Sequence, residues 1–169
     1  MELSFQTSAE DACAFVAKLL WDNLMADACV VSLYDINHDE FVAAGVEGAG
    51  VVGAREKATR GSRGTAVRRH LAVSHAKVDA SESIDPEWCG GPAAFVASYH
   101  RERLFGLVQV QRTPGGAVFE PDEEDGISYV AAQLGEFLAQ NFKRQAVAEY
   151  GDDGGGAPQS KSGRPTARR

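Results

Sequence analysis

The sequence predicts an α+β fold: one antiparallel β-sheet with the N- and C-terminal helices packed on one face and irregular loops and short helices over the other. Three observations predict it. Two pairs of β-branched and aromatic runs, each pair joined by a short polar turn, are typical of hairpins. Apolar residues recur at helical spacing near both ends of the chain. Segments rich in glycine and charge separate the hairpins.

The first helix is expected from about Ser8 to Met25. Thr7 and Glu10 have the spacing of a capping box, in which each side chain bonds to the other residue's backbone amide. Two neighbouring apolar stripes follow. Because they cover more than one face, we expect this helix to pack on the sheet and also on another helix.

The first hairpin is expected from "ACVVSLYD" (28–35) and "EFVAAGV" (40–46). The composition then changes to glycine and basic residues. "GTAVRRH" (64–70) predicts a short helix, "LAVSHAKV" (71–78) a strand, and "DASESIDPEWCGG" (79–91) a loop interrupted by proline and glycine. These middle segments are expected to cover the second face of the sheet.

The second hairpin is expected from residues 92–100 and 103–112. Pro121 introduces the last helix, which has acids in its first turn and a basic pair near its end, as the helix dipole favours. The domain is expected to span residues 1–150. The tail at 151–169 has almost no large apolar residue and is rich in Gly, Pro and Ser, so we expect it to be disordered.

Composition limits the function classes. The 169 residues include no apolar run near the roughly 18 needed to cross a bilayer, and the start of the chain lacks the pattern of a signal peptide, so a cytoplasmic protein is expected. Residues 1–150 hold 13 basic and 22 acidic residues, so a nucleic-acid partner is not expected. The three cysteines and four histidines lack metal-ligand spacing, which predicts no metal and no cofactor.

The segments described above resemble a GAF domain over about residues 8–145. "RLFGLVQVQRTPGGAVFEPDEEDGISYVAAQLGEFLAQ" is similar to the closing strand, turn and helix of that family, and "GTAVRRHLAVSHAKVDASESIDPEW" to its middle. "GPAAFVAS" departs from the usual strand start. The resemblance implies a six-stranded antiparallel sheet, dimerising helices on one side and a small-molecule pocket on the other. It also implies a sensory or regulatory module, since only a minority of the family are enzymes.

The apolar stripes of the two terminal helices are then expected to form a homodimer interface. The positions predicted for it are Val16, Leu20, Leu24, Val130, Leu134, Phe137 and Asn141.

Gly48, Gly50 and Gly53 have the spacing of a dinucleotide-binding turn. Such a turn connects a parallel strand to a helix, whereas here a hairpin precedes it and further glycines follow. A chance pattern in a loop is the favoured interpretation. The basic segment that follows contains Arg60 and Arg63, which could bind an anion or a nucleotide through their forked donors. A solvated loop that balances acidic neighbours is favoured over that site.

Cys89 could serve a reaction like that of the free methionine sulfoxide reductases of this fold, which use several pocket cysteines. Cys89 stands alone in its loop, so an inert cysteine is favoured. His75, Trp88 and Tyr99 could contact a ligand in the implied pocket, although structural roles are favoured for each.

These observations predict a non-enzymatic, dimeric regulatory module that binds a small molecule or a protein partner. The sequence has no segment typical of a kinase, a cyclase or a DNA-binding domain, so its output is expected to pass to another protein. A sulfoxide reductase using Cys89 and a nucleotide-responsive sensor using residues 55–69 remain the alternatives.

Overall fold

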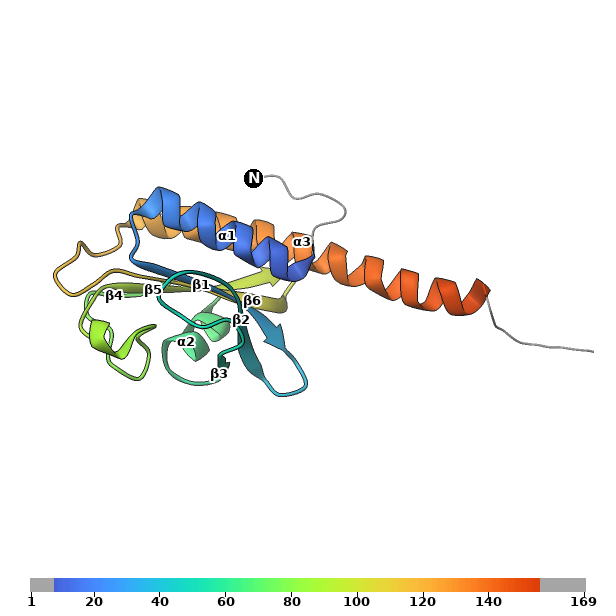
Figure 1. The fold of residues 1–169 in the computed structure, drawn as a ribbon, viewed down its shortest axis with the longest axis horizontal. Helices are drawn as coiled ribbons and strands as arrows, with labels where there is room; N and C mark the ends of the chain where they lie inside the picture. Colours follow the sequence, from blue (N-terminus) through green and yellow to red (C-terminus); the bar gives the residue numbers. More distant parts are fainter. Residues whose placement is uncertain (1–7, 156–169) are drawn as a thin grey trace, which may run out of the picture.

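A six-stranded antiparallel sheet forms the middle layer of the protein (Figure 1). The computed structural model describes residues 8–155, with side chains for residues 8–143. Helices α1 (Ala9–Leu24) and α3 (Pro121–Gly155) cover one face, and α2 (Gly61–Arg69) lies with long loops on the other. The predicted α+β fold is confirmed. Within the described residues no helix combines the length and the apolar character that a membrane span requires.

Both predicted hairpins are present and lie next to each other at the centre of the sheet. The strands run in the order β3-β2-β1-β6-β5-β4, with every neighbouring pair antiparallel. Arg101 and Glu102 both have positive φ, 50° and 66°, as a tight two-residue hairpin turn requires. The bounds are β1 Ala28–Asp35, β2 Glu40–Gly48, β3 Arg55–Lys57, β4 Val73–His75, β5 Ala93–His100 and β6 Arg103–Gln111.

The cap of α1 differs from the predicted one. Ser8 has extended dihedrals and is the N-cap, and its hydroxyl accepts a hydrogen bond of 3.0 Å from the amide of Asp11. Glu10 is therefore not the partner of a capping Thr7, and Thr7 lies outside the described residues. At the other end Met25 takes the left-handed conformation that closes the helix.

Three elements of the middle segment depart from the prediction. β3 lies in the segment that was expected to be irregular, β4 has only three residues, and a 3-10 turn, η1 (Pro86–Trp88), interrupts the expected loop. β3 is a strand because it pairs with β2, although its own sequence, Arg-Glu-Lys, has no strand preference.

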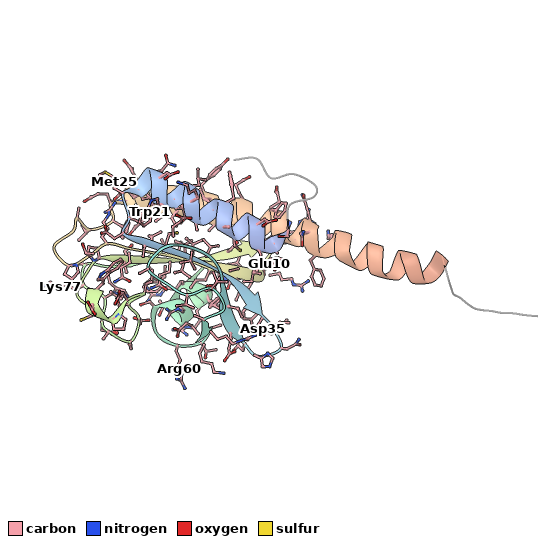
Figure 2. The ribbon with its side chains drawn as sticks, in the orientation of Figure 1. Glu10, Trp21, Met25, Asp35, Arg60 and Lys77 are labelled. Atoms are coloured by element: carbon pink, nitrogen blue, oxygen red, sulfur yellow. The ribbon has the colours of Figure 1, made fainter. Side chains whose placement is uncertain are left out.

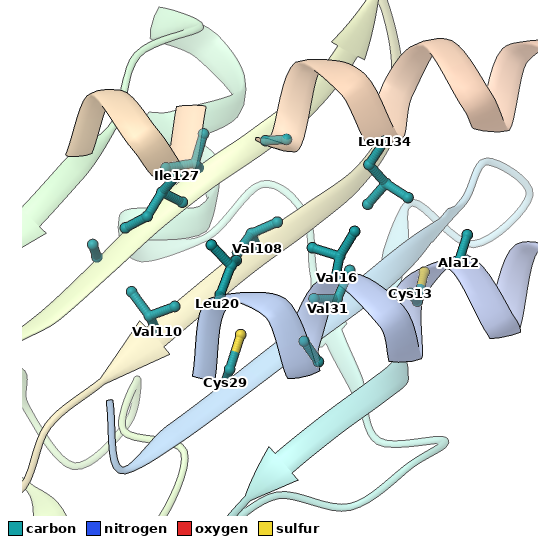
Figure 3. Packing of buried hydrophobic residues seen from close by; sticks show 14 of the residues in the cluster. Ala12, Cys13, Val16, Leu20, Cys29, Val31, Val108, Val110, Ile127 and Leu134 are labelled. Atoms are coloured by element: carbon teal, nitrogen blue, oxygen red, sulfur yellow. The ribbon is translucent and has the colours of Figure 1, made fainter. Parts of the chain in front are cut away.

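The larger core cluster lies between the sheet and the two terminal helices (Figure 3). Val16 and Leu20 of α1 and Leu134 of α3 pack there against Val31 and Val108 of the sheet, all five at most 4% exposed. Glycines let the layers approach closely. A Cβ on Gly135 would lie 2.4 Å from the carbonyl oxygen of Tyr99 on β5, so α3 can lie at this distance only with glycine there.

Six of the seven residues predicted for a dimer interface belong to this core or pack against it, and Asn141 is buried as well. Five of them are at most 9% exposed within a single chain, and the remaining two, Leu24 and Val130, are half-buried against the same cluster. Their apolar surface is wide because α1 and α3 pack on the sheet and also on each other. The homodimer stays a prediction. Tyr129 and Phe142 of α3 are exposed. The buried positions are Val16, Leu20, Leu134, Phe137 and Asn141.

Helix α3 continues to Gly155 and extends beyond the sheet, so it passes the domain boundary expected at residue 150 (Figure 1). The rest of the expected tail, residues 156–169, lies outside the described residues.

Candidate functional site

A cavity of about 370 Å³ lies on the α2 side of the sheet. Its floor comes from strands β1, β2 and β6. Its walls come from the loop after β2, from β3, from residues 83–86 at the start of η1, and from α2. The lining residues are Val30, Ser32, Ala43, Ala49, Gly50, Val51, Ala54, Glu56, Arg63, Ser83, Ile84, Asp85, Pro86 and Gln109.

The glycine pattern of the sequence belongs to this cavity. Gly48, Gly50 and Gly53 all have positive φ, between 75° and 124°, which glycine adopts without strain. The loop leads into the antiparallel strand β3 and not into a helix, so the geometry of a dinucleotide-binding turn is absent there. Its residues 49–51 form one wall of the cavity.

Arg63 is the main charged group of the site. Its side chain is 8% exposed, its Nη2 donates a hydrogen bond of 3.0 Å to Oε1 of Gln109, and its Cζ lies 5.6 Å from the ring centre of Phe95. No described carboxylate lies within 4.0 Å of it. Burial lowers the pKa of Arg63, yet an arginine stays protonated in proteins. The cavity therefore borders a buried cation that has several unused donors.

Two glutamines on β6 position the loop that covers the cavity. Nε2 of Gln109 donates to the carbonyl of Glu82 at 2.8 Å, and Oε1 of Gln111 accepts from the amide of Ile84 at 2.8 Å. Gln111 also donates to Oγ of Ser83 at 2.7 Å. Their alternation along the strand directs both side chains to the α2 side of the sheet. Gln109 thus holds the loop and Arg63 together.

Glu82 caps the N-terminus of α2 from that same loop. Its carboxylate accepts from the amide of Ser62 at 2.5 Å and from the hydroxyl of Ser62 at 2.9 Å. Arg60, the N-cap residue, makes no side-chain cap bond. Because the Ser62 hydroxyl hydrogen is directed to Glu82, the contact of 2.5 Å with Nε2 of His75 makes the histidine the donor. The serine is thus a structural link and not an activated nucleophile.

Besides the guanidinium of Arg63, the hydroxyl of Ser32 is a second polar group at the cavity with unused hydrogen-bonding capacity. Its side chain lines the cavity at 7% exposure, and its hydroxyl has no hydrogen-bond partner in the described part of the chain. Buried hydroxyls normally have a partner, so this group and the free donors of Arg63 are available to a bound molecule.

A smaller cavity of about 290 Å³ shares Glu56 and Arg63 with the first. Lys57 and Arg60 line it, but so do Asp79 and Glu82. Arg60 is exposed and points away from the body of the protein (Figure 2). The charges that line this smaller cavity are mixed in sign, unlike those of a phosphate-binding site.

Four of the residues selected from the sequence lie outside the linings of both cavities. His75 contacts Ser62, and Tyr99 donates to the carbonyl of Val67 at 2.5 Å. Trp88 is half-buried in η1, where its carbonyl accepts from Gln111 at 3.2 Å, and Cys89 is exposed directly after it. Of the predicted ligand residues, Arg63 lines both cavities and Arg60 lines only the smaller one.

The remaining cysteines lie in the other layer. Cys13 on α1 and Cys29 on β1 are fully buried in the helix-side core, where desolvation raises the pKa of each thiol to about 12. None of the three cysteines lines either cavity. Among the described residues no three His, Cys, Asp or Glu side chains form a group that could hold a metal ion.

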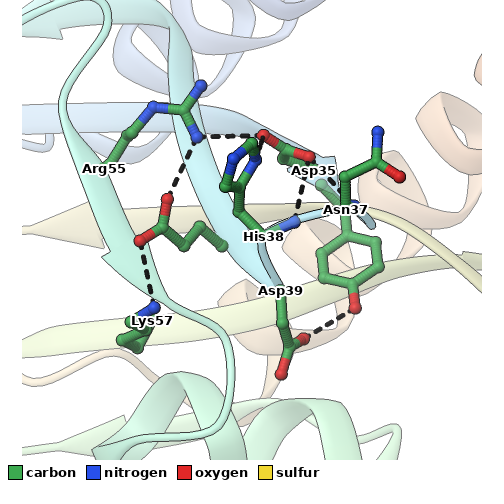
Figure 4. Close-up of polar contacts among 8 residues, drawn as sticks. Asp35, Asn37, His38, Asp39, Arg55 and Lys57 are labelled. Carbon is green, nitrogen blue, oxygen red and sulfur yellow. Dashed lines mark hydrogen bonds and ion pairs between the residues drawn. The ribbon is translucent and has the colours of Figure 1, made fainter.

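Two other basic residues of the segment balance acidic neighbours at the outer end of the first hairpin (Figure 4). Arg55 contacts Asp35 at 2.9 Å and Glu40 at 3.0 Å, and Lys57 contacts Glu40 at 3.2 Å. The hydrogen bonds from Arg55 and then from His38 lower the pKa of Asp35 to about 2. Arg63 alone of this segment is buried against the first cavity.

Apart from Gly50 of the glycine pattern, sequence reasoning missed the cavity-lining residues outside the basic segment. Gln109 is not among the predicted site residues. The pattern "LVQVQ" nevertheless has a polar residue at every second position of an otherwise apolar strand, which indicates polar contacts on one face of the sheet. Nothing in the sequence marks Ser32 or Asp85, because they reach the cavity through the pairing of β1 and through the fold of the η1 loop.

No protein-family model and no curated protein matches this sequence. Solved structures do match its fold. A GAF domain from a phosphoenolpyruvate-protein phosphotransferase of Coxiella burnetii is 21% identical, with a TM-score of 0.70 over 84% of this chain and 89% of that one. The GAF-B domain of DevS from Mycobacterium smegmatis is 19% identical, with a TM-score of 0.68 over 82% of this chain and 99% of that one.

A free methionine-R-sulfoxide reductase from Neisseria meningitidis is similar as well, at 20% identity and a TM-score of 0.67, with 85% of this chain and 84% of that one covered. These likenesses show that the chain has the GAF fold, as the sequence patterns predicted.

Proposed function

We propose that this protein is a non-enzymatic regulatory module that binds a small molecule carrying an anionic group in the cavity beside Arg63. The observation that carries the proposal is the buried guanidinium, which has one hydrogen bond and no ion pair within the described residues and borders a cavity. Burial lowers the pKa of Arg63, and Glu56 and Glu82 oppose this only by attraction beyond ion-pair distance. Burying a charge without a direct ionic contact lowers stability, so a role in binding explains its presence.

The arrangement also supports a route for a response. Gln109 bonds to Arg63 and to the backbone of Glu82, and Glu82 caps α2. A ligand that binds Arg63 changes the charge at a point where the sheet, α2 and the covering loop meet. A ligand that binds one conformation of that loop more tightly increases the population of that conformation, and another protein can bind it selectively.

The two alternative functions have weaker support. A sulfoxide reductase of the multi-cysteine kind needs a second thiol near Cys89, whereas Cys13 and Cys29 are buried in the helix-side core. For a nucleotide sensor using the basic segment, Arg55 and Lys57 are already paired with Asp35 and Glu40. The cavity that Arg60 lines also contains the carboxylates of Asp79 and Glu82, which disfavour a phosphate there. The homodimer, the protein partner and the cytoplasmic location belong to the proposal as expectations.

Thermal unfolding in the presence of a metabolite panel tests the proposal. Amino acids, organic acids, sugars, sugar phosphates and nucleotides are each added at millimolar concentration, and a ligand that binds the folded protein raises Tm. We expect at least one class to raise Tm in the wild type and not in Ser32→Leu, whose larger side chain fills the cavity. A panel without any hit, or hits that Ser32→Leu retains, would exclude the cavity as the site.

A further inference from the structure

The cavity that borders Arg63 also contains two carboxylates. Asp85 is half-buried, and Glu56 is exposed at the edge of β3. Neither forms an ion pair with a described cation. Asp85 uses one oxygen, Oδ1, to accept from the amide of Glu87 at 2.9 Å, which leaves Oδ2 without a described partner. Glu56 also attracts Arg63 electrostatically, but from beyond ion-pair distance. The lining therefore carries charges of both signs that are not joined in a direct ion pair.

This charge pattern restricts the ligand. A simple anion would gain from Arg63 but would share the cavity with two carboxylates, and a simple cation would face a buried guanidinium. A molecule that carries both charges complements both kinds of group. Such pairing is strengthened where the charged group is removed from water, and Arg63 is buried.

The rest of the lining is mainly apolar. Val30 lies on the floor, and Val51 and Ile84 come from the two covering loops. An apolar group of several carbons would be removed from water between them. The free hydroxyl of Ser32 can donate to or accept from one further polar atom of the ligand.

We propose that the cavity binds a small zwitterion, an α-amino acid with an apolar side chain, whose carboxylate contacts Arg63 and whose ammonium contacts Asp85 and Glu56. This inference rests on the proposed function, because it names the ligand class of the same cavity. The side chain of the amino acid lies against Val30, Val51 and Ile84.

Calorimetric titration at pH 7 with three matched probes tests the inference. L-Leucine carries both charges, 4-methylpentanoate lacks the ammonium, and 3-methylbutylamine lacks the carboxylate. L-Isoleucine, L-methionine and L-phenylalanine extend the amino-acid set. We expect at least one amino acid to bind, and to bind at least tenfold more tightly than its analogue lacking either charge.

Two variants assign the charges to residues. Asp85→Asn keeps a capping oxygen for Glu87, so the loop should fold, and it should weaken the amino acid at least fivefold while leaving 4-methylpentanoate unchanged or tighter. Arg63→Met should weaken the amino acid and 4-methylpentanoate at least tenfold each. Glu87→Gln and Arg68→Met, which lie on the same elements outside both cavity linings, are the controls and should bind like the wild type.

The outcomes separate this inference from the proposed function. Equal affinity for L-leucine and 4-methylpentanoate, abolished by Arg63→Met, overturns the zwitterion while the anion-binding cavity stands. Failure of all four amino acids to bind also overturns it, even if the metabolite panel yields another ligand. Failure of the panel as a whole overturns both.

Discussion

Nη2 of Arg63 donates to Oε1 of Gln109 across 3.0 Å, and within the described residues this is the one hydrogen bond of a guanidinium that is 8% exposed. The other end of the same amide, Nε2, donates to the carbonyl of Glu82 at 2.8 Å. One side chain of the sheet therefore fixes both the cation of the cavity and the loop that covers it.

Replacing Gln109 by methionine, which has a similar shape, removes both bonds and leaves the Glu82 carbonyl and one N–H of Arg63 unsatisfied. We expect the free energy of unfolding to fall by about 2–4 kcal/mol, because each buried polar group without a partner costs about 1–3 kcal/mol. Urea unfolding measures this. Gln140→Leu on the exposed side of α3 should stay within about 0.5 kcal/mol of the wild type. Equal stability of the two variants would contradict the bridging role of Gln109.

Arg63→Met should change the stability of the ligand-free protein by no more than about 1 kcal/mol. The variant loses the bond to Gln109, worth about 1 kcal/mol, the contact with Phe95 and the longer-range attraction of Glu56 and Glu82, but it also removes a desolvated charge that has no direct ion pair. The same urea experiment checks this prediction. A loss above about 3 kcal/mol would mean that Arg63 has a structural role.

Two glycines of α3 form a matched pair for testing how closely the layers pack. Gly135→Ala should destabilise the protein by about 1–3 kcal/mol, since the new methyl group would lie 2.4 Å from the backbone oxygen of Tyr99 and α3 must shift. Gly126→Ala has open space, and alanine should stabilise the helix by about 0.5–1 kcal/mol. Thermal unfolding of both variants should give shifts of Tm with opposite sign; shifts of the same sign would refute the packing argument.

Thiol reactivity distinguishes the three cysteines. In the native protein at pH 7 we expect a thiol reagent to label Cys89 alone, because burial raises the pKa of Cys13 and Cys29 to about 12 and removes their sulfur atoms from solvent. Cys89→Ser should leave no rapidly reacting thiol, and unfolding in urea should expose the other two. Rapid native labelling of Cys13 would instead revive a reaction that uses two thiols.

Acid should weaken the outer end of the first hairpin. Arg55 and His38 lower the pKa of Asp35 to about 2, and Arg55 and Lys57 lower that of Glu40. The folded state binds these protons less readily than the unfolded state, so the stabilisation is complete above the unfolded values near 4 and is lost as the pH falls from there toward 2. Urea unfolding at a series of pH values measures this. In the double variant Asp35→Asn/Glu40→Gln, the free energy of unfolding should fall less steeply with acid than in the wild type. Identical acid slopes would show that these ion pairs do not influence stability.

The sequence predicted the elements whose local pattern agrees with their final environment. Both hairpins and both terminal helices carry the period of their own structure, and the turn at Arg101 and Glu102 lies where the polar break occurs. β3 could not be predicted, because Arg55, Glu56 and Lys57 are extended only through their pairing with β2. What the apolar stripes of the terminal helices pack against could not be predicted either. A stripe that packs on another helix of the same chain has the same sequence pattern as one that packs on a second copy.

The site was predictable only in part. The basic segment directed attention to Arg63, but six basic residues of similar context gave no reason to separate the buried one from Arg55 and Arg60. That separation depends on tertiary contacts: Arg63 shares its cavity with residues 83–86, and Gln109 and Gln111 of β6 hold the backbone of this loop. Burial of a charge is a tertiary property, and local sequence does not encode it.

The short strands at the two ends of the sheet have a consequence for solubility. β3 and β4 have three residues each, and all three side chains of β3 are exposed and charged. Both edges offer another chain few backbone groups for pairing, and the β3 edge has no apolar side chain to bury. Such edges disfavour growth of the sheet from molecule to molecule into fibrils.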